Sequence, residues 1–495
     1  MKSIQFTQSY NQLGRAFYSG DKPKSVSNPQ LFIFNQELQK ELNLDGTVLN
    51  PEDGASYFSG NKLIENSSSL AMAYSGHQFG NFSPQLGDGR AILLGSLLDS
   101  SNREYDLQLK GSGRTFYSRG GDGRSALGPV LREYIVSEAM ARLGVPTTRA
   151  LAAVTTGDMV AREGMIPGGI ITRTSRSFVR VGTFQYFSSR NDLDSIKKLA
   201  DYVIARNFPE IDNDKSKYQN LLREVTKRQA YLISKWMGLG FIHGVMNTDN
   251  MSICGETIDY GPCAFMDEFS FDKKFSFIDE NGRYAYSNQP HIALWNLTRF
   301  AESILPLLSK EQKQAIKIAE DELNIFPELY EKYWLKEMRK KLGFELADLN
   351  HKKEKKVIDE LLNIMAESKT DFTQTFNLLT KLKNEKSIDD QPFIRFFNTN
   401  SKVEGWLVDW RLIINKLGIG ELRRQELMEK NNPVIIPRNH QVEKVIRAAE
   451  DRNDFKPFFK LNKALQSPYK FEQDKEKYMH PPTNDEIVER TFCGT

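Results

Sequence analysis

An alternation of apolar and polar positions predicts strands in the first third of the chain. In residues 105–110 every second side chain is apolar, and Lys110 falls on the polar face, a period of two that is typical of a strand. The short apolar run 91–94 follows a Gly-rich turn and predicts a neighbouring strand. Residues 99–102 are typical of the hairpin connection between them. Two more strands are expected around 152–154 and 169–172.

A spacing of three and four residues predicts helices further along. Between Pro129 and Gly144, residues Leu131, Ile135 and Ala139 share one face; proline suits the first turn and glycine the position past the end. From about residue 195 the chain is expected to be helical. Leu222, Val225, Leu232 and Trp236 lie on one helix face, which Gly238 and Gly240 are expected to end. After residue 294 the pattern is mostly amphipathic helix. This order predicts an α+β fold.

Bulk composition favours a folded protein with more than one lobe. The chain has 495 residues, 39% hydrophobic and 26% charged, with a formal net charge of +3. That charge does not point to nucleic acid, and the lysine run 352–356 is interpreted as a solvated helix face. No apolar run approaches the ~20 residues that a membrane span needs, and the first ten residues lack a signal-peptide pattern. We therefore expect a cytoplasmic protein that binds neither nucleic acid nor membrane. A monomer is expected as well.

A cluster of oxygen-bearing side chains follows the helix that ends near residue 240. Asn247, Asp249 and Asn250 lie in one turn, and Asp259 follows after a short apolar stretch. Mg²⁺ prefers oxygen ligands, often one or two carboxylates with substrate phosphates, and a further carboxylate can take a proton from a hydroxyl. The alternative is two Asx turns beside a helix end. His243 is expected to hold this loop by hydrogen bonds rather than to act in catalysis.

Glycines and arginines alternate in a second candidate region, 111–124, directly after Lys110. Glycines let backbone N–H groups approach an anion, and arginines add bidentate charge. Three more arginines follow within residues 171–180. The pattern is neither a Walker A loop nor a dinucleotide fingerprint. It predicts phosphate binding, and the alternative is a surface loop with solvated arginines.

The order of these features matches the order of parts in a protein kinase. A glycine turn at 87–90, Lys110, Glu133, the Asp/Asn loop at 249–250 and Asp259 correspond to the Gly-rich loop, lysine, helix glutamate, catalytic loop and metal-binding aspartate. The His-Arg-Asp loop of kinases is missing from the sequence. The glycine turn also departs from the kinase spacing.

Six segments together resemble the selenoprotein O family of protein adenylyltransferases. They are Ser75-Gly76-His77-Gln78-Phe79-Gly80, Gln85 to Arg90, Gln108 to Gly113, Arg119 to Ser125, His243 to Ser252 and Ile258 to Pro262. The resemblance implies a protein-kinase-like fold with two lobes: a strand-rich N-terminal lobe, residues 1–187, and a larger helical C-terminal lobe, residues 188–495.

The resemblance also implies an activity. Such enzymes bind ATP in an inverted position and transfer AMP to Ser, Thr or Tyr hydroxyls of proteins, releasing pyrophosphate; bacterial members are also described as transferring UMP from UTP. Asp249 is the implied general base, and Asn250 and Asp259 are the implied ligands of Mg²⁺ or Mn²⁺. Glu133 would pair with Lys110. The implied nucleotide contacts are Gly87, Gly89, Arg90, Lys110, Asp122, Gly123, Arg173 and Arg180.

The cysteines depart from the family pattern. Cys493 stands where the family keeps selenocysteine or cysteine, and in some bacterial relatives that thiol pairs with a cysteine in the loop after the Asp-Tyr-Gly segment. Here that loop, residues 266–288, contains no cysteine; the nearest candidate is Cys263, which lies before the loop. Redox regulation by this disulfide is therefore not expected to carry over. Cys254 and Cys263 are interpreted as packing residues.

Two other functions remain open at this point. One is a conventional kinase that transfers the γ-phosphate. The other is a nucleotide-binding protein without activity that serves as an interaction scaffold.

Overall fold

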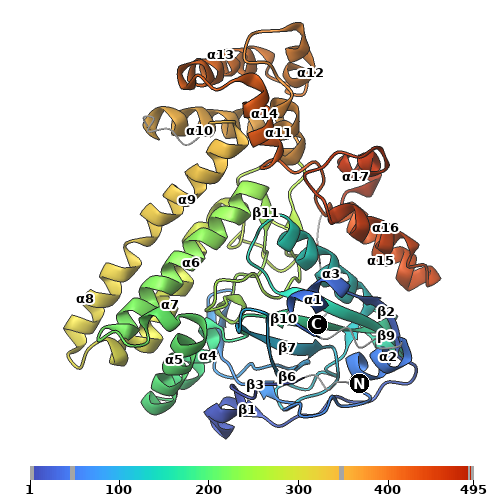
Figure 1. Cartoon of the computed structure of the whole chain (residues 1–495), viewed down its shortest axis with the longest axis vertical. Coiled ribbons are helices and arrows are strands. Elements are labelled where there is room, and N and C mark those ends of the chain that lie inside the picture. Colours follow the sequence, from blue (N-terminus) through green and yellow to red (C-terminus); the bar gives the residue numbers. More distant parts are fainter. Residues whose placement is uncertain (1–4, 45–50, 345–350, 489–490, 492–495) are drawn as a thin grey trace.

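A six-stranded antiparallel sheet organises the N-terminal part of the computed structural model, which describes residues 5–44, 51–344, 351–488 and 491 (Figure 1). The strand order is β2-β9-β10-β7-β6, and β8 pairs with β10 beside this path. The strands are β2 (Gln30–Phe34), β6 (Ala91–Leu98), β7 (Glu104–Lys110), β8 (Ser125–Ala126), β9 (Arg149–Ala161) and β10 (Met165–Ser175).

Strand β7 is the one predicted over residues 105–110, and the turn at 99–102 joins it to β6 as expected. Lys110, its last residue, lies opposite Ala91 of β6 and Ile171 of β10. The polar face of β7 is buried and not solvated. On it, Gln108 accepts a hydrogen bond from Arg173 of the neighbouring strand β10. The expected strands at 152–154 and 169–172 lie within the longer β9 and β10.

Three two-stranded sheets shape the segments around the main sheet. They are β1 (Tyr18–Ser19) with β3 (Ala71–Met72), β4 (Gly76–Gln78) with β5 (Asn81–Ser83), and β11 (Phe241–Ile242) with β12 (Ala264–Phe265). In the third, Phe241 lies opposite Phe265. This pairing closes the chain between them into a loop that contains the predicted metal-binding segment.

Helix α3 (Leu127–Arg142) packs on β9 and β10, and it matches the helix predicted from Pro129. Gly144 follows it in the left-handed region, with φ of 75°. The outer face of α3 is covered by helices from the far end of the chain, α15 (Asn439–Arg452) and α16 (Lys456–Leu465), on the right of Figure 1. Smaller helices near the sheet are α1 (Gln36–Glu41) and α2 (Pro51–Ser59).

The remainder of the described chain is helical. The helices are α4 (Val181–Ser188), α5 (Leu193–Asn207), α6 (Lys217–Leu239), α7 (Gln289–Leu308), α8 (Gln312–Leu323), α9 (Phe326–Lys341), α10 (His351–Ser368), α11 (Phe372–Thr380), α12 (Gln391–Ile394), α13 (Asn400–Leu417), α14 (Glu421–Glu429) and α17 (Glu476–Met479). Helices α6 and α9 lie side by side (Figure 1). The α+β prediction is confirmed.

Two details of the helical part differ from the sequence-based expectation. Helix α4 begins at Val181, before the expected onset near 195, and its buried residues leave no amphipathic period to detect. Helix α6 continues through Gly238 and ends at Leu239. Only Gly240, with φ of 69°, takes the left-handed conformation that ends a helix.

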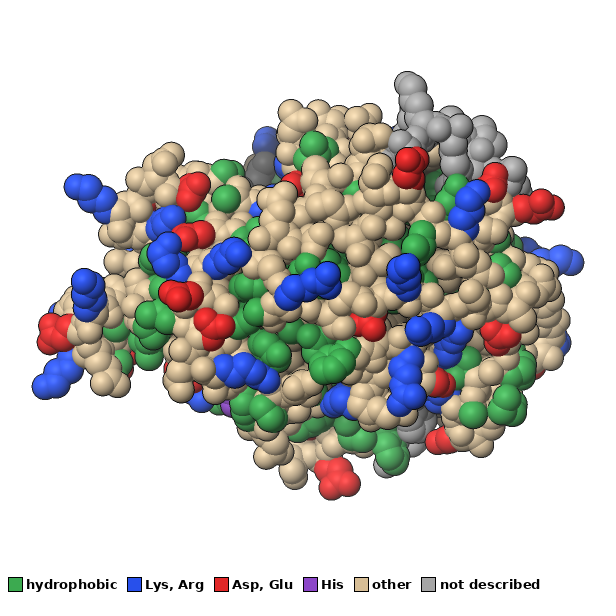
Figure 2. Space-filling view, turned by 90° about the horizontal axis from the view of Figure 1, so that it is seen from below, with side chains coloured by type: hydrophobic (Ala, Val, Ile, Leu, Met, Phe, Trp, Pro, Cys, Tyr) green, Lys and Arg blue, Asp and Glu red, His purple; other side chains and the backbone are tan. Residues whose placement is uncertain are grey.

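The surface carries charges of both signs. On the face drawn in Figure 2, Lys and Arg side chains are spread among acidic and apolar ones. On α10, Lys352 and Lys353 are exposed, and Lys355 pairs with Glu331 at 2.8 Å, as expected for a solvated face. Among the described residues, none of the helices is both long and apolar enough to cross a membrane.

Candidate functional site

A cavity of about 720 Å³ opens where β6, β7, the start of α3 and the loop after β11 meet. Every residue predicted to bind nucleotide or metal, or to act in catalysis, lines it: Gly87, Gly89, Arg90, Lys110, Asp122, Gly123, Arg173, Arg180, Asp249, Asn250 and Asp259. The wall contains eight Lys or Arg residues and five Asp or Glu residues. This positive excess suits a polyphosphate ligand.

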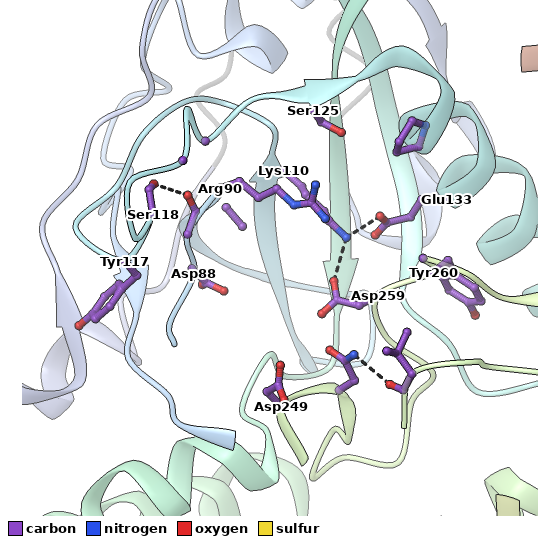
Figure 3. A pocket seen from close by; sticks show the side chains of 18 of the residues that line it. Asp88, Arg90, Lys110, Tyr117, Ser118, Ser125, Glu133, Asp249, Asp259 and Tyr260 are labelled. Atoms are coloured by element: carbon purple, nitrogen blue, oxygen red, sulfur yellow. Dashed lines mark hydrogen bonds and ion pairs between the residues drawn. The ribbon is translucent and has the colours of Figure 1, made fainter. Parts of the chain in front are cut away.

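Lys110 forms an ion pair with Glu133 of α3, with 2.7 Å between Nζ and Oε2 (Figure 3). Arg173 donates to the other oxygen of Glu133 at 2.8 Å. Burial raises the pKa of the Glu133 carboxyl, but the charges of Lys110 and Arg173 outweigh it and lower the pKa below its ordinary value. Glu133 therefore stays ionised and holds two cations at the cavity wall.

Asp259 lies at the centre of three cations. Its Oδ1 is 2.9 Å from Nζ of Lys110 and 2.5 Å from Arg173, and its Oδ2 is 2.8 Å from Arg180. Burial would raise the pKa of this carboxyl, but Arg173, Lys110 and Arg180 hold it well below its usual range. Asp259 and Glu133 together place two carboxylates against these three cations, and Asp88 lies 3.6 Å from Arg180.

Asp249 has a different environment from Asp259, although both line the same cavity (Figure 3). Its Oδ2 accepts a hydrogen bond of 3.1 Å from Nε2 of Gln78, and its Oδ1 is buried without a partner among the described residues. Burial raises the pKa of Asp249 to about 6, against the lowering effect of the Gln78 hydrogen bond. A carboxylate with a pKa near neutrality is suited to accept a proton from a hydroxyl.

Oxygen atoms near Asp249 fit a hard divalent cation. The Asn250 amide group donates to the Val245 carbonyl at 2.9 Å, which leaves its Oδ1 as the atom that could bind a metal. Asp259 supplies carboxylate oxygens to the same cavity. In the described ranges no three His, Cys, Asp or Glu side chains are grouped to hold a metal alone. Substrate phosphates would have to complete the shell of Mg²⁺ or Mn²⁺.

Two of the predicted glycines are required by close packing. Gly87 has φ of 81°, and a Cβ there would lie 2.2 Å from Cγ of Tyr117. Gly123 has φ of 68°, and a Cβ would lie 2.2 Å from the Gly113 carbonyl oxygen. Any larger residue would push these loops into the cavity or away from it.

His243 holds the loop from outside the cavity, as expected. The Val245 N–H donates to Nδ1 at 3.4 Å, so Nε2 carries the proton and donates to the Ile258 carbonyl at 2.9 Å. Burial lowers the pKa of His243, in agreement with this neutral tautomer. The bond fixes the residue before Asp259, whose φ of 60° is uncommon outside glycine.

Some residues of the site are not predicted by the sequence. Asp88 is 2% exposed between the two glycines of the turn, and it accepts from Gln108 at 3.0 Å; in the sequence, Gln78 is only one member of a motif. Arg162 pairs with the predicted nucleotide contact Asp122 at 2.9 Å. Conversely, Arg114 and Arg176 of the two arginine clusters are not among the lining residues.

Of the cysteines that the structure describes, Cys254 and Cys263, neither lines this cavity. Cys254 and Cys263 are both buried, in agreement with packing roles. Cys493 lies outside the described residues.

Comparison with known proteins decides the family. The family model described as "Protein adenylyltransferase SelO" matches residues 1–466. The chain belongs to this family. Three relatives are each called protein nucleotidyltransferase YdiU. The one from Agrobacterium fabrum is 49% identical over 495 residues, which cover 99% of this chain and 100% of the relative. Those from Anoxybacillus flavithermus and Rhizobium meliloti are each 48% identical, over 490 residues (99% of this chain, 99% of the relative) and 498 residues (100% of each). The resemblance seen in the motifs is confirmed, and SelO membership makes this chain a nucleotidyltransferase enzyme.

Proposed function

We propose that this SelO-family protein transfers AMP from ATP to Ser, Thr or Tyr hydroxyls of proteins and releases pyrophosphate, with UMP transfer from UTP as an alternative. One observation carries the proposal: a buried carboxylate with a raised pKa, Asp249, lines the same cavity as the cations Lys110, Arg173 and Arg180. A proton acceptor and a polyphosphate-binding wall in one cavity are what nucleotidyl transfer requires.

The proposed reaction uses both the proton acceptor and the cationic wall of the cavity. The acceptor oxygen attacks the α-phosphorus while its proton passes to Asp249. The bond from the α-phosphorus to the bridging oxygen breaks, and that oxygen leaves with the electron pair as part of pyrophosphate. Lys110, Arg173 and Arg180 then stabilise the charge that develops on the departing phosphates. Glu133 keeps Lys110 and Arg173 in place.

The nucleotide and the metal are assigned to the remaining predicted residues. Gly87, Gly89 and Gly123 would let the backbone approach the phosphates, and Arg90 and Asp122 would contact the nucleotide from the two loops. Asn250 and Asp259 would hold Mg²⁺ or Mn²⁺, which would neutralise phosphate charge when bound. Asp259 would then exchange part of its contact with the three cations for the metal.

The proposal extends to the architecture and the setting. The order of sheet lysine, helix glutamate and metal-loop aspartate supports a kinase-like fold with lobes 1–187 and 188–495. We propose a monomer in the bacterial cytoplasm that modifies proteins and binds neither nucleic acid nor membrane.

Labelled ATP separates this function from its alternatives. With α-labelled ATP, Mg²⁺ or Mn²⁺ and casein as a generic acceptor, we expect label on casein or on the chain itself, and none from γ-labelled ATP. Label from the γ position alone would identify a conventional kinase. Binding of ATP with no label from either position would identify an interaction scaffold.

Substitution of the proposed metal ligand tests the second half of the proposal. Asp259→Ala removes a carboxylate ligand, so transfer of α-label should be lost. Wild-type transfer in this variant would refute the metal assignment. Binding of Mn²⁺ and nucleotide, measured separately, would show at which step the variant fails.

A further inference from the structure

The motif Ser75 to Gly80 contains strand β4 and the turn of the hairpin β4–β5, and it is bonded to the loop that contains Asp249. The His77 N–H donates to Oγ1 of Thr248 at 2.7 Å, and the Phe79 N–H donates to Oδ1 of Asn247 at 3.1 Å. Between them, Gln78 donates to Oδ2 of Asp249 at 3.1 Å. Three consecutive residues of the hairpin thus contact three consecutive residues of the loop.

Gly76 brings the strand against the Asp249 carboxylate itself. A Cβ on Gly76 would lie 2.5 Å from Oδ1 and 2.9 Å from Cβ of Asp249. Its backbone is not in the left-handed region, so the contact alone excludes a side chain here. Because the loop is also bonded to the strand on either side, the carboxylate could not move away without breaking those bonds.

Helix α4 packs against both the hairpin and the loop that contains Asp249. Gln185 contacts Nδ1 of His77 at 2.8 Å and accepts from Oγ1 of Thr248 at 2.6 Å, so one amide joins strand and loop. A Cβ on Gly182 would lie 2.1 Å from the Ser75 carbonyl oxygen. The hairpin therefore has little room to shift, and the position of Gln78 relative to Asp249 is fixed.

We propose that Gln78 and Gly76 are positioning residues for proton transfer to Asp249. The Gln78 amide occupies Oδ2 and sets the carboxylate's orientation, while the bare backbone of Gly76 gives Oδ1 its space. Oδ1 has no hydrogen-bond partner among the described residues and is buried against Gly76, so the two contacts together fix the carboxylate that takes the proton of the acceptor hydroxyl. The inference rests on the proposed role of Asp249.

The first test replaces only the amide donor. Gln78→Met keeps the length of the side chain without charge or donor. Because a small misplacement of a catalytic group costs up to about 100-fold, we expect kcat for α-label transfer to fall about 10- to 100-fold. Binding of α,β-methylene-ATP should stay within about twofold of wild type, since the side-chain hydrogen bond of Gln78 goes to Asp249 and not to a residue assigned to the nucleotide. Gln314→Met, at an exposed glutamine of α8, is the matched control and should leave both unchanged.

The second test uses the space beside Gly76. Gly76→Ala should reduce kcat at least as strongly with analogue binding retained, because the added methyl group meets the carboxylate directly. Gly405→Ala, where a Cβ would meet nothing within 4 Å, makes the same change in α13 and should leave transfer unchanged.

The outcomes separate this inference from the proposed function. If wild-type protein transfers no α-label, the proposed function fails. If wild type transfers and Asp249→Asn does not, while Gln78→Met and Gly76→Ala keep wild-type kcat, the inference alone is overturned. It is equally overturned if both variants lose analogue binding and thermal stability along with kcat, because the hairpin would then serve folding in general.

Discussion

Lys341, at the end of α9, is a buried cation outside the active site. It is 4% exposed, its Nζ lies 4.3 Å from the centre of the Phe376 ring, and the described residues give it no ion pair. Burial lowers the pKa of its ammonium to about 7. An unfolded chain would keep that proton up to a pKa of about 10.4. Between these values the unfolded state binds more protons, so this group makes the free energy of unfolding rise with pH.

Replacing Lys341 with methionine should remove this dependence. We expect Lys341→Met to be more stable than wild type at pH 7, and wild type to gain on it by up to about 1.4 kcal/mol per pH unit between about pH 7.5 and 9.5. Thermal unfolding of both proteins across that range measures the difference. The exposed neighbour Lys336 is the control, because Lys336→Met should follow wild type at every pH. Parallel curves for wild type and Lys341→Met would show that Lys341 is charged in the fold.

At the residue scale, the sequence indicates which side chains can act chemically better than it indicates which residues they contact in the fold. Lys110 and Asp259 could be singled out because an oxygen cluster and a strand lysine are local features. That Arg173 and Arg180 close around Asp259 could not, because these contacts span 86 and 79 residues. The role of Gln78 was hidden for the same reason: an amide carries no chemical signal until its acceptor is known.

At the scale of elements, glycine marks an ending only where the backbone turns left-handed. Gly240 does so directly after α6, and a Cβ there would also lie 3.0 Å from the Phe372 ring. Gly238 is helical, and a Cβ there would make only an ordinary contact of 3.5 Å with Glu337. In the sequence the two glycines look alike, and only the backbone conformation in the fold separates them.

Alanine at these two positions should therefore have opposite effects. Gly240→Ala should lower the free energy of unfolding by about 1–2 kcal/mol, because a side chain in the left-handed region is strained. Gly238→Ala should raise it by about 0.5–1 kcal/mol, because alanine is the better helix former. Chemical denaturation of both variants beside wild type measures the pair. Equal signs for the two changes would refute the assigned helix end.

At the scale of the whole molecule, local periodicity predicts the α+β class but not its assembly. Strands and helices have their own periods, so their order could be predicted from the sequence. Helix α15 packs on α3 across some 300 residues of chain, through contacts such as the Gly128 N–H to Glu450 at 2.7 Å. Apolar stripes in the sequence show that both helices pack against something, but they do not identify the element that covers each helix. The C-terminal helices thereby support the helix that carries Glu133.

Arg438 joins three distant segments and should be the strongest test of this assembly. It precedes α15, is fully buried, and binds both oxygens of Asp371, the residue that caps α11, at 2.7 and 3.1 Å. It also pairs with Asp267, eight residues after Asp259. Arg438→Met would leave these carboxylates buried without their cation, at a cost of about 3–5 kcal/mol.

Arg447→Met is the control, at a half-exposed arginine within α15. It should cost less than about 1 kcal/mol, although Arg447 also has acidic partners. Equal losses of stability in the two variants would show that the number of ion pairs, and not burial of the link between segments, decides the effect.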